Sequence, residues 1–283
     1  MTPKHKQRAG IGRRALLAGV GLAGPALLSS RTFAQTGGGV VIKRLDWAGV
    51  RVECGEAAAY IDAVAPQGEA HAGSEEFAST RRLKYGLVTH GHGDHFDIDF
   101  LRRMLGERGV VFCQRAVAGD IDARVLRVQP VDLWEPVFMP RSGADMVGFA
   151  TPAVDGFGLA QTSWVLRCGD KRIIHCGDTV WHGEFWDIGR ALGPFDVACL
   201  PINGARQNIG RFQDLGAPGV LTPQQAVAAA RALGAGLIVP IHYGSTDDPN
   251  YIETPHALQQ LREEARRYDI GVRALERGEE MTL

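Results

Sequence analysis

Four candidate metal ligands within six residues constrain this chain more than any other feature of its sequence. They are His90, His92, Asp94 and His95, and they directly follow the apolar run Tyr85–Thr89, which predicts a buried strand. Imidazole nitrogens and carboxylate oxygens are the ligands that zinc-like ions take at about 2.0–2.2 Å. The alternative is a solvated histidine loop, but composition alone would give this pattern in roughly one chain of this size in a few thousand. The segment therefore predicts a metal site at the end of a strand.

Two later segments place a further candidate ligand at the end of a predicted strand. The run Arg172–Cys176 leads through a glycine to Asp178, and the run Leu237–Ile241 leads directly to His242. Ligands of α/β proteins gather at the carboxyl ends of strands, so we expect Asp178 and His242 to join the histidine segment.

Three segments together resemble the metallo-β-lactamase-fold hydrolases: residues 90–95, residues 175–179 (HCGDT) and residues 240–244 (PIHYG). Residues 193–196, 200–202 and 222–223 look most like the subset that includes ascorbate-phosphate lactonase and N-acylphosphatidylethanolamine phospholipase D. The resemblance covers residues 43–275. It implies an α/β fold, a four-layer αββα sandwich with a dinuclear metal site on one edge. It also implies a role for each ligand: His90 and His92 on metal 1, Asp94, His95 and His242 on metal 2, and Asp178 bridging both.

One position departs from the family pattern. The family usually supplies a third histidine to metal 1 from a Pro-x-x-His segment, and here Thr151–Gly156 carries Asp155 at that place. If Asp155 is a ligand, the site has one more oxygen ligand, and its metal preference shifts from zinc towards Mn²⁺ or Fe²⁺. Alternatively, metal 1 is weakened and Asp155 only accepts backbone hydrogen bonds.

Four other polar residues are candidates for the surroundings of the site. His182 is a candidate substrate binder or general acid, with a surface or outer position as the alternative. Asn203 follows a predicted strand and is a candidate substrate contact. Asp62 is expected to orient a ligand histidine rather than to bind metal. His175 lies inside an apolar run and is expected to be a hydrogen-bonded core histidine.

Composition and missing motifs exclude several classes of protein. The 283 residues are 45% hydrophobic and 22% charged, which is typical of a globular chain. The first 34 residues hold six basic residues and no acidic one, so the rest is mildly acidic and offers no basic stripe to nucleic acid. No nucleophile elbow, P-loop or dinucleotide glycine pattern is present.

The N-terminal segment predicts export. Residues 1–34 combine the pair Arg13-Arg14, the apolar stretch Ala15–Leu28 and a small-residue cleavage site before Gln35, and they resemble a twin-arginine signal. The stretch would span about 21 Å as a helix, less than the roughly 30 Å of a bilayer core. We expect no stable membrane anchor, passage through the twin-arginine machinery, and a periplasmic or secreted protein. An N-terminal anchor or a buried helix is the alternative. Residues 35–42 then form a lead-in, and residues 43–283 the hydrolase domain.

Secondary structure is predicted from periodicity and caps. Strands are expected at Val40–Leu45, Val50–Cys54 and Ala58–Asp62, and later at Ser163–Arg167 and Asp196–Ile202. Helices are expected over residues 97–105 and, after the capping residue Thr222, over residues 223–233; Thr254 and Pro255 are expected to start the last helix in the same way. The five cysteines lack any C-x-x-C spacing and are expected to be buried thiols, with one disulfide as the alternative.

These expectations combine into one function. The chain is predicted to be an exported metal-dependent hydrolase that cleaves a lactone or other carboxylic ester, or a phosphodiester, in a small-molecule substrate. Two divalent cations, zinc first and manganese or iron as alternatives, would share an activated water, with Asp94, Asp178 and His182 in the catalytic centre. The rival interpretations are an iron-dependent redox enzyme on the same fold and a ligand-binding protein without turnover. The oligomeric state does not follow from the sequence.

Overall fold

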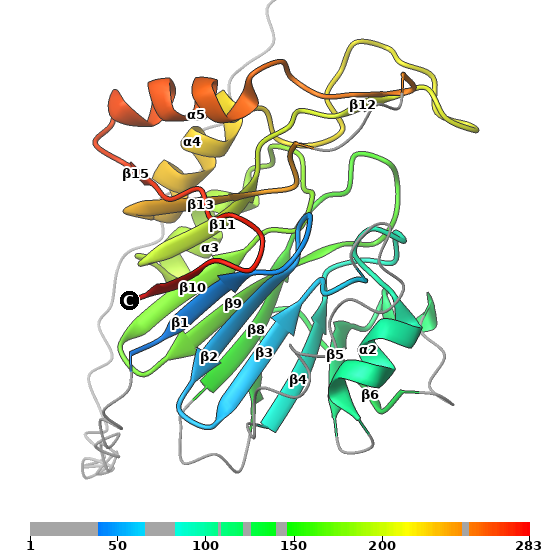
Figure 1. Ribbon diagram of the computed structural model, residues 1–283, viewed down its shortest axis with the longest axis vertical. Helices are drawn as coiled ribbons and strands as arrows, with labels where there is room; N and C mark the ends of the chain where they lie inside the picture. Colours follow the sequence, from blue (N-terminus) through cyan, green and yellow to red (C-terminus); the bar gives the residue numbers. More distant parts are fainter. Residues whose placement is uncertain (1–38, 66–82, 107–108, 121–125, 140–145, 245–248) are drawn as a thin grey trace, which may run out of the picture. The chain divides into compact units, whose positions relative to one another are not determined.

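Two mixed sheets form the centre of the structure, a computed structural model that describes residues 39–65, 83–106, 109–120, 126–139, 146–244 and 249–283 (Figure 1). The first sheet has seven strands, in the spatial order β16 (Glu280–Thr282), β1 (Val41–Arg44), β2 (Val50–Cys54), β3 (Ala57–Ile61), β4 (Leu83–Val88), β5 (Val110–Gln114) and β6 (Val128–Val131). The second also has seven, in the order β15 (Gly271–Val272), β13 (Leu237–Ile241), β11 (Val197–Pro201), β10 (Lys171–His175), β9 (Thr162–Cys168), β8 (Met146–Pro152) and β7 (Pro136–Phe138). A separate pair joins β12 (Arg206–Gln207) to β14 (Tyr251–Ile252).

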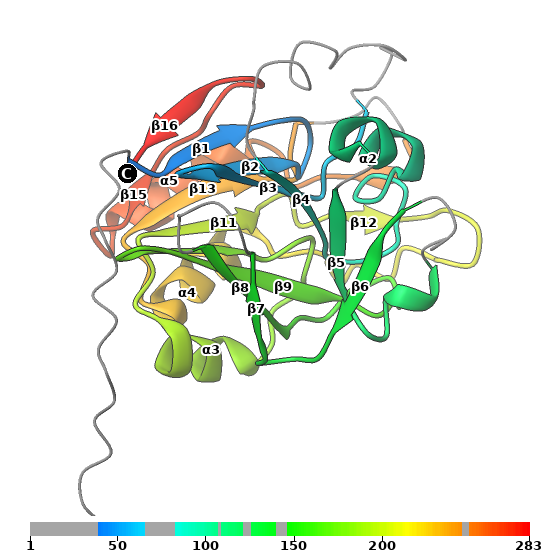
Figure 2. The same cartoon turned by 90° about the horizontal axis from the view of Figure 1, so that it is seen from below.

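Helices cover the outer faces of the two sheets. On the first sheet, α2 (Ile98–Leu105) buries Phe100, Leu101 and Met104 against side chains of β3 and β5. On the second, one apolar cluster joins its strands to α3 (Glu184–Leu192), α4 (Pro223–Leu233) and α5 (Ala257–Arg266). Figure 2 shows α2 and α3 on opposite sides of the two sheets. This order of helix, sheet, sheet and helix is the predicted four-layer αββα sandwich, which is therefore confirmed. A short 3-10 turn, η1 (Ala118–Asp120), completes the helical elements of the described chain. None of the helices described is both long and apolar enough to cross a membrane.

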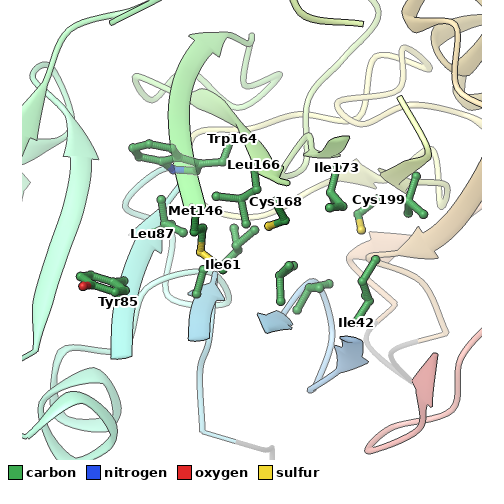
Figure 3. Close-up of a cluster of buried hydrophobic side chains, with 14 of the residues drawn as sticks. Ile42, Ile61, Tyr85, Leu87, Met146, Trp164, Leu166, Cys168, Ile173 and Cys199 are labelled. Carbon is green, nitrogen blue, oxygen red and sulfur yellow. The ribbon is translucent and has the colours of Figure 1, made fainter. Parts of the chain in front are cut away.

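The space between the sheets holds the main apolar core (Figure 3). Ile42 and Leu87 of the first sheet are buried there together with Trp164 and Leu166 of the second. The indole Nε1–H of Trp164 donates to the carbonyl of Val88 at 3.0 Å, so the largest buried side chain leaves no donor unpaired. Burying each such apolar side chain contributes about 1.5–3 kcal/mol, and this core holds the two sheets face to face.

Strand direction decides which loops share an edge of the second sheet. β8 and β10 are both antiparallel to β9, so they run the same way. β10, β11 and β13 are parallel to one another. The loops that follow β8, β10 and β13 therefore emerge at one edge, which is where a site built from several strand ends can form.

Most predicted elements agree with the observed ones to within two residues. Thr222 and Gln225 form the predicted capping box of α4, and Gly234 ends that helix at a left-handed φ of 68°. Asp97 caps α2 by accepting from the amide of Phe100 at 2.9 Å. β1 begins at Val41, so folded structure starts before residue 43, because Ile42 already belongs to the core. The predicted export signal lies outside the described residues.

The predicted start of the last helix is wrong. α5 begins at Ala257, after His256 at a φ of 54°, and no side chain caps it. The amide of Thr254 donates instead to the carbonyl of Asn203 at 2.6 Å, which ties this segment to the loop after β11. Thr254 therefore lies in the segment before α5 and does not cap the helix.

None of the five cysteines, all of which lie in the described part of the chain, forms a disulfide. Cys113, Cys168, Cys176 and Cys199 are buried, as expected, and Cys54 is half-buried. Burial raises the pKa of the Cys113 thiol to about 11 and that of Cys176 to about 12.

Candidate metal centre

The seven predicted ligands meet at one edge of the sandwich. In each of three groups, one ligand atom per residue lies within 4.8 Å of the others, and the groups share members. The groups are His90 with His95 and Asp178, Asp94 with His95 and His242, and His92 with Asp155 and Asp178. The first sheet supplies the histidine segment after β4, and the second supplies the loops after β8, β10 and β13.

Asp178 occupies the middle of this arrangement. Its Oδ1 lies 3.5 Å from His90 Nε2, and its Oδ2 lies 4.0 Å from His95 Nε2. Two ligand atoms that bind the same tetrahedral ion at about 2.1 Å lie about 3.4 Å apart. The distances from the Asp178 oxygens to the two histidine nitrogens are close to this value. Asp178 also belongs to the group of His92 and Asp155, so this one carboxylate is common to two of the three groups.

The turn before Asp178 requires a glycine. Gly177 has a φ of 62°, in the left-handed region, and a Cβ there would lie 2.7 Å from Gln161 Nε2 and 3.0 Å from Thr89 Oγ1. Any side chain would therefore be strained and would displace the neighbours of the site. This glycine lets the chain turn sharply from β10 and present Asp178.

His95, Asp94 and His242 form one flank of the centre. Asp94 Oδ2 lies 3.7 Å from His95 Nε2 and 3.5 Å from His242 Nε2. Asp62 fixes the ring of His95, because its Oδ2 lies 2.8 Å from His95 Nδ1 and leaves Nε2 to face the centre. Asp62 is in turn held by the amide and hydroxyl of Thr89, at 2.9 and 2.7 Å. Asp62 thus fixes the ring of a candidate ligand, which is the position that the sequence predicts for it.

His92 and Asp155 form the other flank. Asp155 Oδ2 lies 3.9 Å from His92 Nδ1, and His92 Nδ1 lies 2.9 Å from His90 Nε2. The Asp155 carboxylate also accepts the amides of Phe157 at 2.7 Å and Leu159 at 2.6 Å. A carboxylate oxygen has two lone pairs, so it can accept an amide and face a cation at once. Asp155 thus lies among the candidate ligands and also accepts backbone hydrogen bonds.

Unpaired polar atoms show that these side chains fit a cation. Within the described chain, His95 Nε2, Asp178 Oδ1 and both ring nitrogens of His242 are buried without a hydrogen-bond partner. Buried polar atoms without partners are costly, and here they lie on the candidate ligands themselves. Divalent cations at the centre would satisfy Nε2 of both histidines and Asp178 Oδ1.

The charges of the site point the same way. Burial raises the pKa of Asp178 to about 7, with Asp155 and Asp94 adding to the rise against the opposing effect of His95. Burial alone would lower the pKa of His95, but Asp94, Asp62 and Asp178 raise it to about 10. Without a metal, His95 therefore carries a proton, and its positive charge balances these carboxylates. A bound cation would supply that positive charge instead.

The other ligand histidines are prepared in their neutral form. Burial lowers the pKa of His242 to about 4, against the opposing effect of Asp94. Burial, with the nearby His95 and His92, also lowers the pKa of His90 well below its usual value. Neutral imidazole is the form that binds metal, so no proton need leave these two rings at neutral pH.

The remaining predicted residues lie outside the three ligand groups. His175 is a core histidine, as expected: its Nε2 lies 2.8 Å from the Ala48 carbonyl, and its Nδ1 accepts the amide of Gly177 at 3.2 Å. Asn203 is buried and donates to the hydroxyl of Tyr251 at 2.9 Å. His182 lies outside the three ligand groups and stacks on Phe185, with ring centroids 4.1 Å apart.

Sequence reasoning missed Trp47, whose indole Nε1–H donates to Asp94 Oδ2 at 3.0 Å. No local pattern marks it, because only the fold brings the β1–β2 turn beside the histidine segment. Its backbone offers a further sign that this region is special. Trp47, Asp62 and His242 have positive φ values of 49°, 47° and 54°. Such conformations cost a non-glycine residue about 1–2 kcal/mol and cluster at functional sites.

Comparison with known proteins agrees with this geometry. Residues 59–243, more than half of the chain, match the family model described as a beta-lactamase superfamily domain. The chain belongs to this superfamily. It is a metal-dependent hydrolase with the metallo-β-lactamase fold.

Individual relatives are more distant. A UPF0173 metal-dependent hydrolase of Methanoregula boonei is 29% identical over 170 residues, which cover 56% of this chain and 66%, slightly less than two thirds, of the relative. The structure of Igni18, a metallo hydrolase of Ignicoccus hospitalis, has a TM-score of 0.68 at 20% identity and covers 87% of this chain and 99% of that one. CmlA, a diiron beta-hydroxylase of Streptomyces venezuelae, has a TM-score of 0.67 at 16% identity and covers 87% of this chain and 54% of that one. At these identities, the two structures show the shared fold alone.

Proposed function

We propose that this protein binds two divalent cations and hydrolyses an ester bond, either in a lactone or other carboxylic ester or in a phosphodiester. The observation that carries the proposal is the position of Asp178, which belongs to two ligand groups, one with His90 and His95 and the other with His92 and Asp155. A carboxylate placed in this way suits a pair of cations better than a single one. The unpaired buried atoms of the ligands support the same assignment.

Each side chain has a distinct part in this proposal. His90, His92 and Asp155 would hold one cation, Asp94, His95 and His242 would hold the other, and Asp178 would hold both. The pair would lower the pKa of a bound water and polarise the carbonyl or phosphoryl oxygen under attack. Asp62 keeps Nε2 of His95 directed at the centre throughout.

His182 is the proposed proton carrier or substrate contact. Both of its ring nitrogens are buried without a partner in the described chain, and burial lowers its pKa to about 4. A neutral imidazole has one donor and one acceptor, so it can hydrogen-bond a substrate oxygen at neutral pH. Its stacking on Phe185 would hold the ring in place.

Zinc is the first candidate metal, and Asp155 is the reason to include manganese and iron. Three carboxylates and four imidazoles give an oxygen-richer centre than the usual family pattern, and harder ions favour oxygen ligands. A redox enzyme is therefore the second candidate function, and a diiron hydroxylase shares the fold. Iron content coupled to oxygen consumption, without hydrolysis, would favour it.

The test joins metal analysis to a substrate panel. Purified protein is supplied with Zn²⁺, Mn²⁺ or Fe²⁺, its metal content is measured, and lactones, carboxylic esters and phosphodiesters are assayed before and after chelation. We expect two ions per chain, hydrolysis of one panel class, loss on chelation and recovery on adding metal. A folded protein that takes up none of these ions would overturn the proposal.

Export through the twin-arginine route is part of the same proposal. It rests on the pair Arg13-Arg14 and the short apolar stretch that follows. Replacing both arginines by lysine should leave the precursor inside the cell, whereas the unchanged protein should be cleaved after Ala34. Cell fractionation and N-terminal sequencing measure both. Unchanged export of the double variant would indicate another route.

A further inference from the structure

The turn between β1 and β2 brings the first sheet against the His242 side of the centre. It is closed by bonds from the Leu45 amide to the Gly49 carbonyl at 2.9 Å and from the Gly49 amide to the Asp46 carbonyl at 2.6 Å. The turn places Trp47 at a φ of 49°, and Asp46 Oδ1 accepts the Trp47 amide at 3.0 Å. A bulky residue in the left-handed region is unfavourable, so its surroundings must hold it there.

Two bonds from the second sheet anchor this turn. Nε2 of the buried His175 lies 2.8 Å from the Ala48 carbonyl. The amide of His242 donates to the Trp47 carbonyl at 3.2 Å, so a candidate ligand and the turn fix each other's backbone. The turn is therefore positioned by the same strands that deliver Asp178 and His242.

The side chain of Trp47 contacts two candidate ligands. Its Nε1–H donates at 3.0 Å to Asp94 Oδ2, the oxygen that also faces His95 and His242. Its ring lies 4.4 Å from the His242 ring, measured between centroids. The Asp94 side chain is 45% exposed, and the bond from Trp47 restrains it from outside the set of candidate ligands.

We propose that Trp47 is a positioning residue, which holds Asp94 and His242 in the arrangement that a cation requires on this flank. The indole is a neutral donor, so it orients the carboxylate without adding charge. Its bond uses one of the two lone pairs of Oδ2 and leaves the second available to a cation at the centre. The Asp94 side chain then loses less conformational entropy when a metal ion binds. The inference rests on the proposed metal centre and is independent of the substrate.

The test compares Trp47→Phe with a matched control, Trp134→Phe. Phenylalanine keeps an aromatic ring beside His242 but removes the N–H. Trp134 also has a positive φ, 69°, is partly exposed, and contacts none of the candidate ligands. Co²⁺ is titrated against a chromophoric chelator to obtain stepwise dissociation constants, and the visible spectrum of the bound Co²⁺ reports its coordination. We expect Trp47→Phe to weaken one binding step about 10–100-fold and change the spectrum of that ion. The other step and the control should stay as in the unchanged protein.

Each outcome has a separate meaning. Equal stepwise binding and spectra in Trp47→Phe and the unchanged protein would overturn the role of Trp47 alone. If the unchanged protein binds no Co²⁺, the metal centre and this inference both fail. If Trp47→Phe proves unstable, β-(3-benzothienyl)alanine introduced at position 47 keeps the ring shape and replaces the N–H by sulfur. Normal binding by that variant would also overturn the proposal.

Discussion

The two flanks of the metal centre are built very differently. On the flank of Asp94, His95 and His242, each side chain or its backbone is held by a residue from elsewhere in the fold: Asp62 at 2.8 Å and Trp47 at 3.0 and 3.2 Å. On the other flank, Thr89 Oγ1 lies 3.0 Å from Nδ1 of the buried His90, and the Asp155 carboxylate is held by amides of its own loop, so His92 is the member without an outer partner. The His92 side chain is 29% exposed, and its only polar neighbours in the described chain are other candidate ligands.

This contrast indicates which of the two proposed cations would meet ligands that are already ordered. Ligands fixed by outer hydrogen bonds lose little freedom when a cation arrives, whereas His92 must be ordered by the ion. We therefore expect the cation of the His95 flank to bind more tightly and that of the His92 flank to exchange more readily. The following variants test this asymmetry.

The largest effect is expected from Asp178→Ala, because Asp178 serves both flanks. Two cations would then face each other without their shared carboxylate. We expect loss of at least one ion and a fall in turnover greater than about 100-fold, more than the loss of an outer partner costs. Metal content and activity measure this, with the exposed Asp132→Ala as the control. Full metal content and activity in Asp178→Ala would show that the centre lies elsewhere or holds a single ion.

Asp155→Ala should separate the flanks. Removing this carboxylate should release the ion of the His92 flank and leave that of the His95 flank in place. Two carboxylates on one ion also acidify a bound water less, so the unchanged protein should reach half-maximal activity at a higher pH than Asp155→His. Metal stoichiometry and pH profiles of the three proteins check this. If Asp155→Ala keeps both ions and full activity, Asp155 is not a ligand.

Asp62→Asn should weaken the better-held flank without removing a ligand. The amide no longer supplies a negative charge opposite His95 Nδ1, so Nε2 is less basic and less well directed. We expect about 10–100-fold weaker binding of that ion and little change in the other. Stepwise Co²⁺ titration measures both, with Asp132→Asn as the matched control. An equal loss at both steps would mean that Asp62 acts on the whole site rather than on its flank.

The smallest effect is expected at His182, which belongs to neither flank. Its substitution should change the stability of the fold without touching a candidate ligand. Its pKa of about 4 lies below the ordinary value of 6.5, so the unfolded chain takes up its proton first as the pH falls. Folded stability is therefore lost between about pH 6.5 and pH 4, by about 1–2 kcal/mol after allowing for solvent near the ring. His182→Phe lacks this loss, so its free energy of unfolding should rise relative to the unchanged protein towards low pH. Urea unfolding of metal-free protein at pH 7 and pH 4.5 measures it, and a constant difference would refute the assignment.

The sequence made the centre predictable wherever a ligand follows a strand. The segment after β4, Asp178 after β10 and His242 after β13 are local signals. A polar residue directly after a strand lies at the end of the sheet wherever that strand pairs. Asp62 could also be anticipated, as an acid directly after a buried run. Trp47 could not, because its bond to Asp94 joins positions 47 residues apart through a turn of unusual backbone.

The same distinction applies to the helices. α4 carries a capping box, a proline at its start and a glycine at its end, so its bounds could be read from local chemistry. α3 begins after Gly183 with no capping side chain, so only the acidic residues of its first turn, Glu184 and Asp187, mark its start in the sequence. Thr254 shows the converse, because it is a good capping residue by type, yet α5 begins only at Ala257 and has no capping side chain.

The hydrogen bond between His175 and Ala48 has a consequence for the alignment of the sandwich. Apolar packing between two sheets has no preferred direction, so it resists their separation far more than a small lateral slide of one over the other. The centre takes four of its seven candidate ligands from the first sheet and three from the second, so a lateral slide would change every distance between the two sets. The imidazole of β10 reaches the carbonyl of the opposite turn at 2.8 Å, and such a bond weakens steeply when it is misaligned. Together with the bonds from Trp164 to the Val88 carbonyl and from the His242 amide to the Trp47 carbonyl, this buried contact fixes the lateral position of one sheet on the other, and with it the two sets of candidate ligands.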